Sequence, residues 1–393
     1  MKSLTVRAAV LASFLGAGAA VAQQFPGEAP LLTDHVALTS RADFLKAGEA
    51  YFHPQADWII FQATPAPGPG EPAGEHYSMD VAKVMRNGLG AIIGLEEPIL
   101  LSAPGSANTC GWFHPTQRDR VLYGSTLRPP TAEDAPGYQR DSGRYKWAFP
   151  AEMEIVTQTV PAIAGRTGEP STPEPMFVRP DYDAEGSWSA DGKFVLYSHV
   201  EMETSEPGRP DADVYVYDIQ AGEHRKLVEA PGYDGGPFFS PCQNWIIYRS
   251  DRRGDNMLQL FASELERSAD GAIVGIKREI ALTDNEHVNW APFFHPSGRF
   301  IVYGTSEVGH FNYEVFAIEW DPAKSPEQLR RERLTTTDGA DVLPVFTPDG
   351  EWMMWTAQRG ELGAGDQRPS SQIWAARIDA EAIFPAEQNG AGD

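Results

Sequence analysis

The stretch Phe346-Thr347-Pro348-Asp349-Gly350, followed by Glu351-Trp352-Met353-Met354-Trp355, sets the pattern for the whole chain. An aromatic residue enters a tight turn, and a hydrophobic run then ends in a second aromatic. Five further copies, one of them with Ala in place of the turn Pro, begin at Phe52, Phe113, Trp188, Phe239 and Phe294. Aromatic residues are only 11% of the 393 residues, so two of them at matched positions in six segments indicate a structural repeat.

The spacing and content of the repeats predict the fold. Successive first aromatics lie 51 to 75 residues apart, which fits one four-stranded propeller blade per repeat. In the tetrad after the aromatic, Pro presets φ and Gly accepts φ > 0, as a tight turn requires. Residues 244–250, 213–218 and 223–228 have the composition of second, third and fourth strands. The sequence therefore predicts an all-β fold, a six-bladed β-propeller with four antiparallel strands per blade.

The domain boundaries follow from the repeats. We expect a propeller over residues 23–383 and a polar tail over 384–393, with repeats around 47–64, 108–126, 183–200, 234–250, 289–305 and 341–357. The last repeat lacks a fourth strand, whereas residues 34–39 resemble a fourth strand that precedes the first repeat. We expect this N-terminal segment to pair with residues 372–378 and close the ring, because closure removes exposed sheet edges.

Residues 1–22 have the features of a secretory signal peptide. Lys2 and Arg7 precede an apolar run that is too short to span a bilayer, and Ala20-Val21-Ala22 forms a small-residue cleavage site. We expect cleavage near Ala22, a periplasmic or secreted protein, and no membrane insertion. The two cysteines, Cys110 and Cys242, are too few for a disulfide framework and are expected to be unpaired.

The charge of the chain limits its partners. A net charge of -23 argues against nucleic acid and anionic membranes, because both require a basic face. Two segments rich in Pro and Gly, residues 65–76 and an insertion at 127–150, each follow a second strand and should lie on the same rim. That rim is a candidate surface for partner recognition, or merely a place where loop length varies.

The repeat resembles that of the TolB-like propeller family. Its pattern of Leu-Thr, Asn or Asp, Pro-x-Phe and Ser-Pro-Asp-Gly appears here as Leu334-Thr335, Asp341, Pro344, Phe346 and Thr347 to Gly350. The first three repeats are looser. The resemblance implies a six-bladed propeller in the periplasm with a partner-binding role in the cell envelope. TolB carries an additional α/β domain before its propeller, which we expect this chain to lack, so TolB's own complex is not carried over.

Asn or Asp recurs five residues before the first aromatic, in five of the six repeats: Asn108, Asp183, Asp234, Asn289 and Asp341, with Ala47 in the first. These positions enter the inner strands and are candidates for binding at a mouth of the central channel. They could instead cap the turns before the strands. A third possibility is a ring of oxygen ligands for Ca²⁺. The alternating acids Asp181, Asp183 and Glu185 resemble a calcium loop, although Gly192 stands where the loop needs its last acid.

Histidine follows the first aromatic in three repeats, as His53, His114 and His295. These side chains could cap their turns, or bind a transition metal if they converged. No catalytic motif of a serine hydrolase, zinc protease or nucleotide-binding enzyme is present. The sequence favours a monomeric, non-catalytic module that binds an envelope protein or glycan and needs no cofactor. The alternative is a hydrolase or lyase acting on carbohydrate or peptide in the channel, with candidate residues Glu49, Glu185, Asp234, Glu286, His287 and Asp341.

Overall fold

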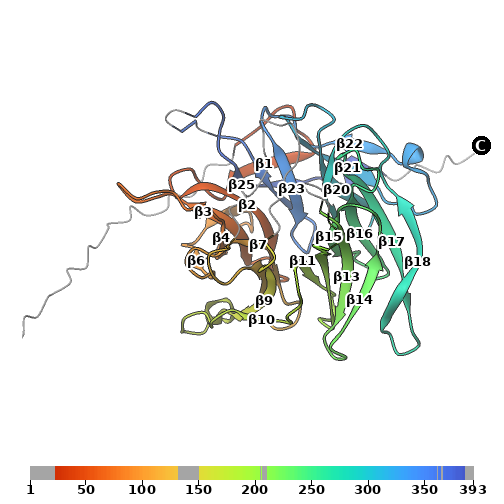
Figure 1. Cartoon of the computed structure of the whole chain (residues 1–393). Coiled ribbons are helices and arrows are strands. Elements are labelled where there is room, and N and C mark those ends of the chain that lie inside the picture. The colour runs from red at the N-terminus through yellow and green to blue at the C-terminus, as the bar shows by residue number, and fades with distance from the viewer. Residues whose placement is uncertain are drawn as a thin grey trace, which may run out of the picture.

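A computed structural model describes residues 23–131, 150–203, 205, 210–360, 362–363 and 366–385. Six antiparallel sheets surround a common centre, which confirms the six-bladed propeller (Figure 1). In that view the inner strands β2, β7, β11, β15 and β23 lie near the centre, and β6, β14 and β18 lie at the periphery. The expected signal at 1–22, most of the 127–150 insertion and tail residues 386–393 lie outside the described residues.

The first three blades contain strands in sequence order. Blade 1 consists of β2 (Phe44–Phe52), β3 (Trp58–Pro65), β4 (Ser78–Arg86) and β5 (Ile92–Leu95), with β6 (Ile99–Leu100) also paired to β4. Blade 2 consists of β7 (Asn108–Phe113), β8 (Arg120–Ser125), β9 (Glu154–Thr159) and β10 (Glu174–Pro175). Blade 3 consists of β11 (Tyr182–Trp188), β12 (Phe194–Val200), β13 (Ala212–Asp218) and β14 (Glu223–Val228).

Blades 4 and 5 continue this order, and blade 6 departs from it. Blade 4 consists of β15 (Asp234–Phe239), β16 (Trp245–Ser250), β17 (Gln259–Arg267) and β18 (Ile273–Ala281). Blade 5 consists of β19 (Asn289–Phe294), β20 (Phe300–Thr305), β21 (Glu314–Glu319) and β22 (Arg331–Arg333). Blade 6 takes its outer strand from the other end of the chain: β23 (Asp341–Phe346), β24 (Trp352–Ala357), β25 (Gln372–Ile378) and β1 (Leu32–Ala37).

The pairing of β1 with β25 confirms that the N-terminal strand closes the ring. Val36 pairs with Ala375 in an antiparallel register. The strand lies two residues earlier than the expected 34–39, because the backbone amides of Leu38 and Thr39 both turn to the carbonyl of Ile373 and leave the regular ladder. After β25, the short helix α1 (Ala380–Ile383) leads to Phe384, which packs against Phe300, one residue beyond the expected end of the propeller.

The paired aromatics are core residues, as expected for packing between blades. The second aromatic of each repeat is buried with at most 1% of its surface exposed: Phe61, Tyr123, Tyr197, Tyr248, Tyr303 and Trp355. Large aromatic side chains contribute most to the energy of such a core. They fill the space between neighbouring sheets, and this is why the repeat is visible in the sequence.

The strand order gives the ring two different faces. Each inner strand begins on the face that we call the loop face, which also carries the loops between second and third strands and the connections between blades. The opposite face, the turn face, carries the tight turns after the inner strands and the outer hairpins. Residues 65–76 and the described ends of the 127–150 insertion link second to third strands, so both belong to the loop face.

Candidate functional site

A β-bulge interrupts the inner strand of every blade at the same position. The register shifts in all six inner pairs, and one residue in each bulge has φ between 45° and 61°. These residues are Glu49, Cys110, Glu185, Gly236, Ala291 and Leu343, and each lies two positions after the recurring Asn or Asp, or after Ala47 in the first blade. All six line the central cavity, together with Tyr51, Gly186, Phe238 and Arg249. The bulge therefore turns one residue per blade toward the channel, and in five blades that residue carries a side chain.

Glu49 and Cys110 meet in this cavity. The Cys110 thiol donates a hydrogen bond to Glu49 Oε1 at 2.9 Å. Burial raises the pKa of Glu49, and the nearby Glu185 carboxylate adds to that effect. Burial and the Glu49 and Glu185 charges hold the pKa of the Cys110 thiol well above its usual value. The thiol therefore stays protonated and is a poor nucleophile.

Glu185 is the most heavily bonded group of the cavity. It accepts hydrogen bonds from Tyr233 Oη at 2.6 and 2.7 Å and from the Gly236 amide at 2.6 Å, and it pairs with Arg249 Nη2 at 2.8 Å. A Cβ on Gly236 would lie 2.0 Å from Arg249 Nη1, so the guanidinium fits only over a glycine. The cavity that remains is about 10 Å³, room for about one water molecule.

The five recurring Asn and Asp residues lie in the first two positions of the inner strands and are all buried. The three Asp residues bond to the second strand of their own blade or the residues that follow it: Asp183 to His199 at 2.9 Å, Asp234 to Arg252 at 3.1 Å, and Asp341 to Arg359. The two Asn residues reach the preceding blade, where Asn108 donates to the Tyr77 carbonyl and Asn289 to Gln259 Oε1. These contacts explain why Asn and Asp recur, and a binding role for the five stays a prediction.

The acids of the calcium-loop pattern do not share one site. Asp181 accepts from the Met202 amide, Asp183 faces His199, and Glu185 lies in the central cavity. Within the described residues, no three His, Cys, Asp or Glu side chains are placed so that they could hold a metal ion.

The histidines and the remaining acid-base candidates also lie apart. His114 accepts from the Gln117 amide in its own turn, while His53 and His295 also reach a carbonyl of the next blade, at Arg118 and Gly350. Of the proposed catalytic residues, the structure brings only Glu49 and Glu185 into one cavity. Asp234 and Asp341 lie within their blades, and Glu286 and His287 lie in the connection before β19.

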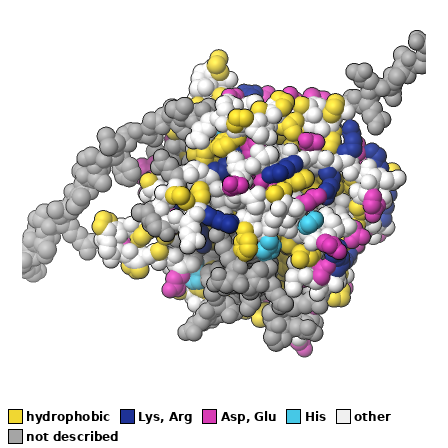
Figure 2. Space-filling view, turned by 90° about the horizontal axis from the view of Figure 1, so that it is seen from above, with side chains coloured by type: hydrophobic (Ala, Val, Ile, Leu, Met, Phe, Trp, Pro, Cys, Tyr) yellow, Lys and Arg dark blue, Asp and Glu magenta, His cyan; other side chains and the backbone are white. Residues whose placement is uncertain are grey.

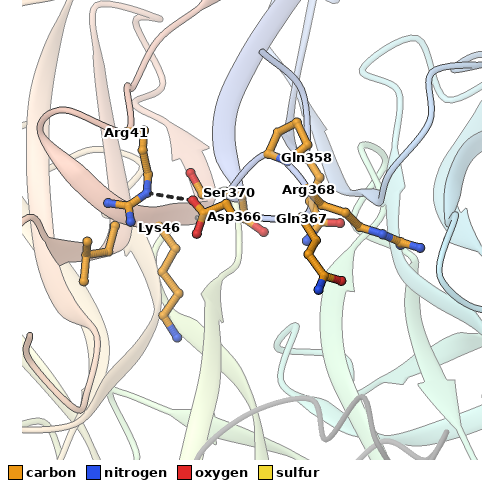
Figure 3. A pocket seen from close by; sticks show the side chains of 10 residues that line it. Arg41, Lys46, Gln358, Asp366, Gln367, Arg368 and Ser370 are labelled. Atoms are coloured by element: carbon orange, nitrogen blue, oxygen red, sulfur yellow. Dashed lines mark ion pairs between the residues drawn. The ribbon is translucent and has the colours of Figure 1, made fainter. Parts of the chain in front are cut away.

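A larger pocket opens on the loop face where blade 6 meets blade 1. This mouth pocket has a volume of about 400 Å³ and is lined by Arg41, Leu45, Lys46, Gln358 and residues 366–371. Figure 3 shows Arg41 and Lys46 on one side, and Gln367 and Arg368 on the other. Three cations and one carboxylate, Asp366, line it, on a chain whose net charge is -23. Nothing in the sequence marks this pocket, because ring closure alone brings its two halves together.

Exposed apolar side chains also gather on the loop face. Of the exposed large hydrophobic residues described, five lie in its loops: Val178, Met202, Val308, Phe311 and Leu362. Phe311 adjoins the mouth pocket, because Arg368 Nη1 donates to the Phe311 carbonyl at 3.0 Å. On the side of the molecule shown in Figure 2, acidic and basic side chains are interspersed and form no large field of one sign.

Comparison with known proteins agrees with the repeat pattern and the fold. No family model matches the chain. The Tol-Pal system protein TolB of Wolinella succinogenes is 29% identical over 177 residues, which cover 45% of this chain and 37% of that protein. The chain therefore has a six-bladed propeller fold and resembles TolB in sequence over part of its length. The uncharacterized protein Atu1656 of Agrobacterium fabrum is 27% identical over 160 residues, which cover 40% of this propeller and 44% of the relative.

The similarity has a limited extent. This TolB-like propeller spans less than half of the length of the two curated relatives it matches. A solved luciferin-regenerating enzyme shares the fold at 8% identity, with a TM-score of 0.52 over 87% of this chain and 94% of that one. Across the described segments, every helix is too short or too polar to cross a membrane.

Proposed function

We propose that this TolB-like propeller is exported and acts as a monomeric, non-catalytic binding module in the cell envelope, with a protein or glycan partner on its loop face. The observation that carries the proposal is the mouth pocket beside Phe311. Aromatic residues and Arg are enriched in protein interfaces, and Phe311 and Arg368 lie together here. The TolB relative of the Tol-Pal system and the signal-like residues 1–22 support a periplasmic or secreted location.

The volumes of the mouth pocket and the central cavity favour binding on the loop face over catalysis in the channel. A pocket for a small ligand usually has a volume of roughly 300–1,000 Å³. The mouth pocket, at about 400 Å³, lies in that range, whereas the cavity between Glu49 and Glu185, at about 10 Å³, does not. A sugar or peptide has no room beside these two carboxylates. This is why we favour a partner on the surface over a hydrolase or lyase substrate in the channel.

The test is chemical cross-linking in the native envelope, followed by affinity capture and mass spectrometry. We compare wild type with Phe311→Ala, and use Leu89→Ala as the matched control, because Leu89 is a 91% exposed apolar residue on the turn face. We expect one partner that cross-links to loop-face residues and whose recovery falls at least five-fold in Phe311→Ala only. Loss in Leu89→Ala alone, or turnover of a glycan or peptide that requires Glu49, would overturn the proposal.

A further inference from the structure

We infer that the mouth pocket recognises the carboxylates of an acidic peptide segment. The inference rests on the proposed function, since it names the chemistry by which a partner would be held on the loop face. It starts from the charge of the pocket, which is opposite to that of the chain. Arg41, Lys46 and Arg368 line it from two segments more than 300 residues apart in the sequence, against the single carboxylate of Asp366.

Two of the three cations have no carboxylate partner among the described residues. Lys46 Nζ lies over the ring of Tyr77, 4.2 Å from its centroid. Arg368 donates to the Phe311 carbonyl and lies 5.8 Å from the centroid of that ring. A guanidinium has five N–H donors, and the carbonyl occupies one. An incoming carboxylate could therefore pair with Lys46 and Arg368 without first breaking an internal ion pair.

The third cation is weakly held. Arg41 Nε lies 3.6 Å from Asp366 Oδ2, and each side chain is more than a third exposed. Pairs of this kind contribute little to stability because water screens them. Arg41 can thus exchange Asp366 for a ligand carboxylate at small cost, and the guanidinium geometry suits two parallel hydrogen bonds to a carboxylate.

The rest of the lining favours a peptide over a glycan. Gln358, Gln367, Ser370 and Ser371 supply amide and hydroxyl groups that can bond to a peptide backbone, and Leu45 and Pro369 supply the apolar surface. Among the described residues that line the pocket none is aromatic, so a sugar would find no ring to stack on within this lining. Because the net charge of the chain is -23, general attraction of an acidic peptide to the protein is weak, and a positive pocket favours binding at one place.

The experiment measures fluorescence anisotropy of a labelled hexaglutamate peptide with the purified chain that starts at Gln23. Hexaglutamine is the neutral probe, and the variants are Lys46→Gln/Arg368→Gln and the control Arg225→Gln, an exposed cation on β14 of blade 3. We expect hexaglutamate to bind at least ten-fold more tightly than hexaglutamine, and more weakly as salt rises. We expect the affinity for hexaglutamate to fall at least ten-fold in the double variant and less than two-fold in Arg225→Gln. The thermal unfolding temperature should be unchanged in both.

Other outcomes overturn the inference. Equal affinity for the two peptides, or equal loss in the double variant and Arg225→Gln, shows that general charge and not the pocket binds the probe. Binding of a polyuronate oligosaccharide, but not hexaglutamate, that depends on Lys46 and Arg368 assigns the pocket to an acidic glycan instead. If wild type and double variant capture the same envelope partner equally, the pocket inference fails and the binding module stands. If wild type captures none, the proposed function fails, while the peptide titration still decides the chemistry of the pocket.

Discussion

Arg359 and Glu28 form a buried, two-pronged ion pair although 331 residues separate them in the sequence. Nη1 lies 3.0 Å from Oε2, and Nη2 lies 2.6 Å from Oε1. The same guanidinium bonds Asp341 at the start of β23, and Glu28 also contacts His35 of β1. Charge as well as the β-ladder therefore holds the closing strand on blade 6.

Replacing this guanidinium should destabilise the protein strongly. Arg359→Leu leaves Glu28 and Asp341 buried without their counter-charge, and breaking a buried pair in this way typically costs about 3–5 kcal/mol. The control is Arg377→Leu on β25 of the same blade, whose pair with Glu351 is exposed and worth about 1 kcal/mol or less. Urea unfolding measures the loss of unfolding free energy in each variant. Equal losses in the two variants would show that the buried pair has no special role.

The same ion pair should make the free energy of unfolding depend on pH in the acidic range. Burial raises the pKa of Glu28, but hydrogen bonds from His35 and Arg359 outweigh burial and lower it to about 2. A depressed pKa adds stability above the ordinary value of 4.5, and this contribution is lost as pH falls from 4.5 through about 2. A shift of this size corresponds to about 3 kcal/mol.

The variant Glu28→Gln isolates this effect from other titrating groups. It should be less stable than wild type at pH 6, and the difference in unfolding free energy between the two should shrink as pH is lowered to 3. A difference that stays constant over this range would contradict the assignment.

Gly236 should tolerate alanine far less well than another glycine with the same backbone conformation. Gly236 has φ of 61° and Gly222 has φ of 68°, so alanine strains the backbone similarly at both, by about 1–2 kcal/mol. No atom lies within 4 Å of a Cβ on Gly222, whereas a Cβ on Gly236 meets Arg249 at 2.0 Å. We expect Gly236→Ala to cost about 1–3 kcal/mol more in chemical unfolding, as overpacked sites do. Equal costs would show that Arg249 moves aside freely.

The two free thiols should differ in reactivity. Cys242 is exposed, whereas Cys110 is buried and its pKa is raised well above the usual value by burial and the Glu49 and Glu185 charges. Titration with a thiol reagent at pH 8 should label one thiol per native chain and two in denaturant, and Cys242→Ser should abolish the native reaction. Rapid labelling of Cys110 in the native Cys242→Ser variant would mean that the central cavity opens to solvent.

The fold was predictable because the residues that encode it repeat. The second aromatics, such as Tyr248 and Trp355, occupy the same buried position in each blade. Their regular recurrence in the sequence therefore predicts the blades. The closing strand is predictable from the strand count, since the last repeat lacks a strand and the first has a surplus. Its bounds differ from the prediction because the amides of Leu38 and Thr39 both bond to the Ile373 carbonyl and end the ladder early.

The lining of the channel was not predictable in the same way. The feature that repeats there is a backbone conformation with positive φ. The residues that adopt it, such as Glu49, Cys110 and Leu343, have side chains with no chemistry in common. The residue type that recurs is the buried Asn or Asp two positions earlier. It recurs because its side chain bonds to neighbouring strands and loops. The mouth pocket has no motif at all, since its two halves meet only when the ring is closed.

Ring closure also has a consequence for the order of folding. Blades 1 to 5 consist of consecutive strands and can form from local contacts, but Val36 of β1 must wait for Ala375 of β25. Pairing over so long a separation has a large entropic cost and is slow. β1 is therefore the earliest strand to be synthesised and the last to find its partner. Until it does, the outer edge of β25 stays unpaired, and the folding chain exposes one sheet edge that only its own N-terminal strand can cover.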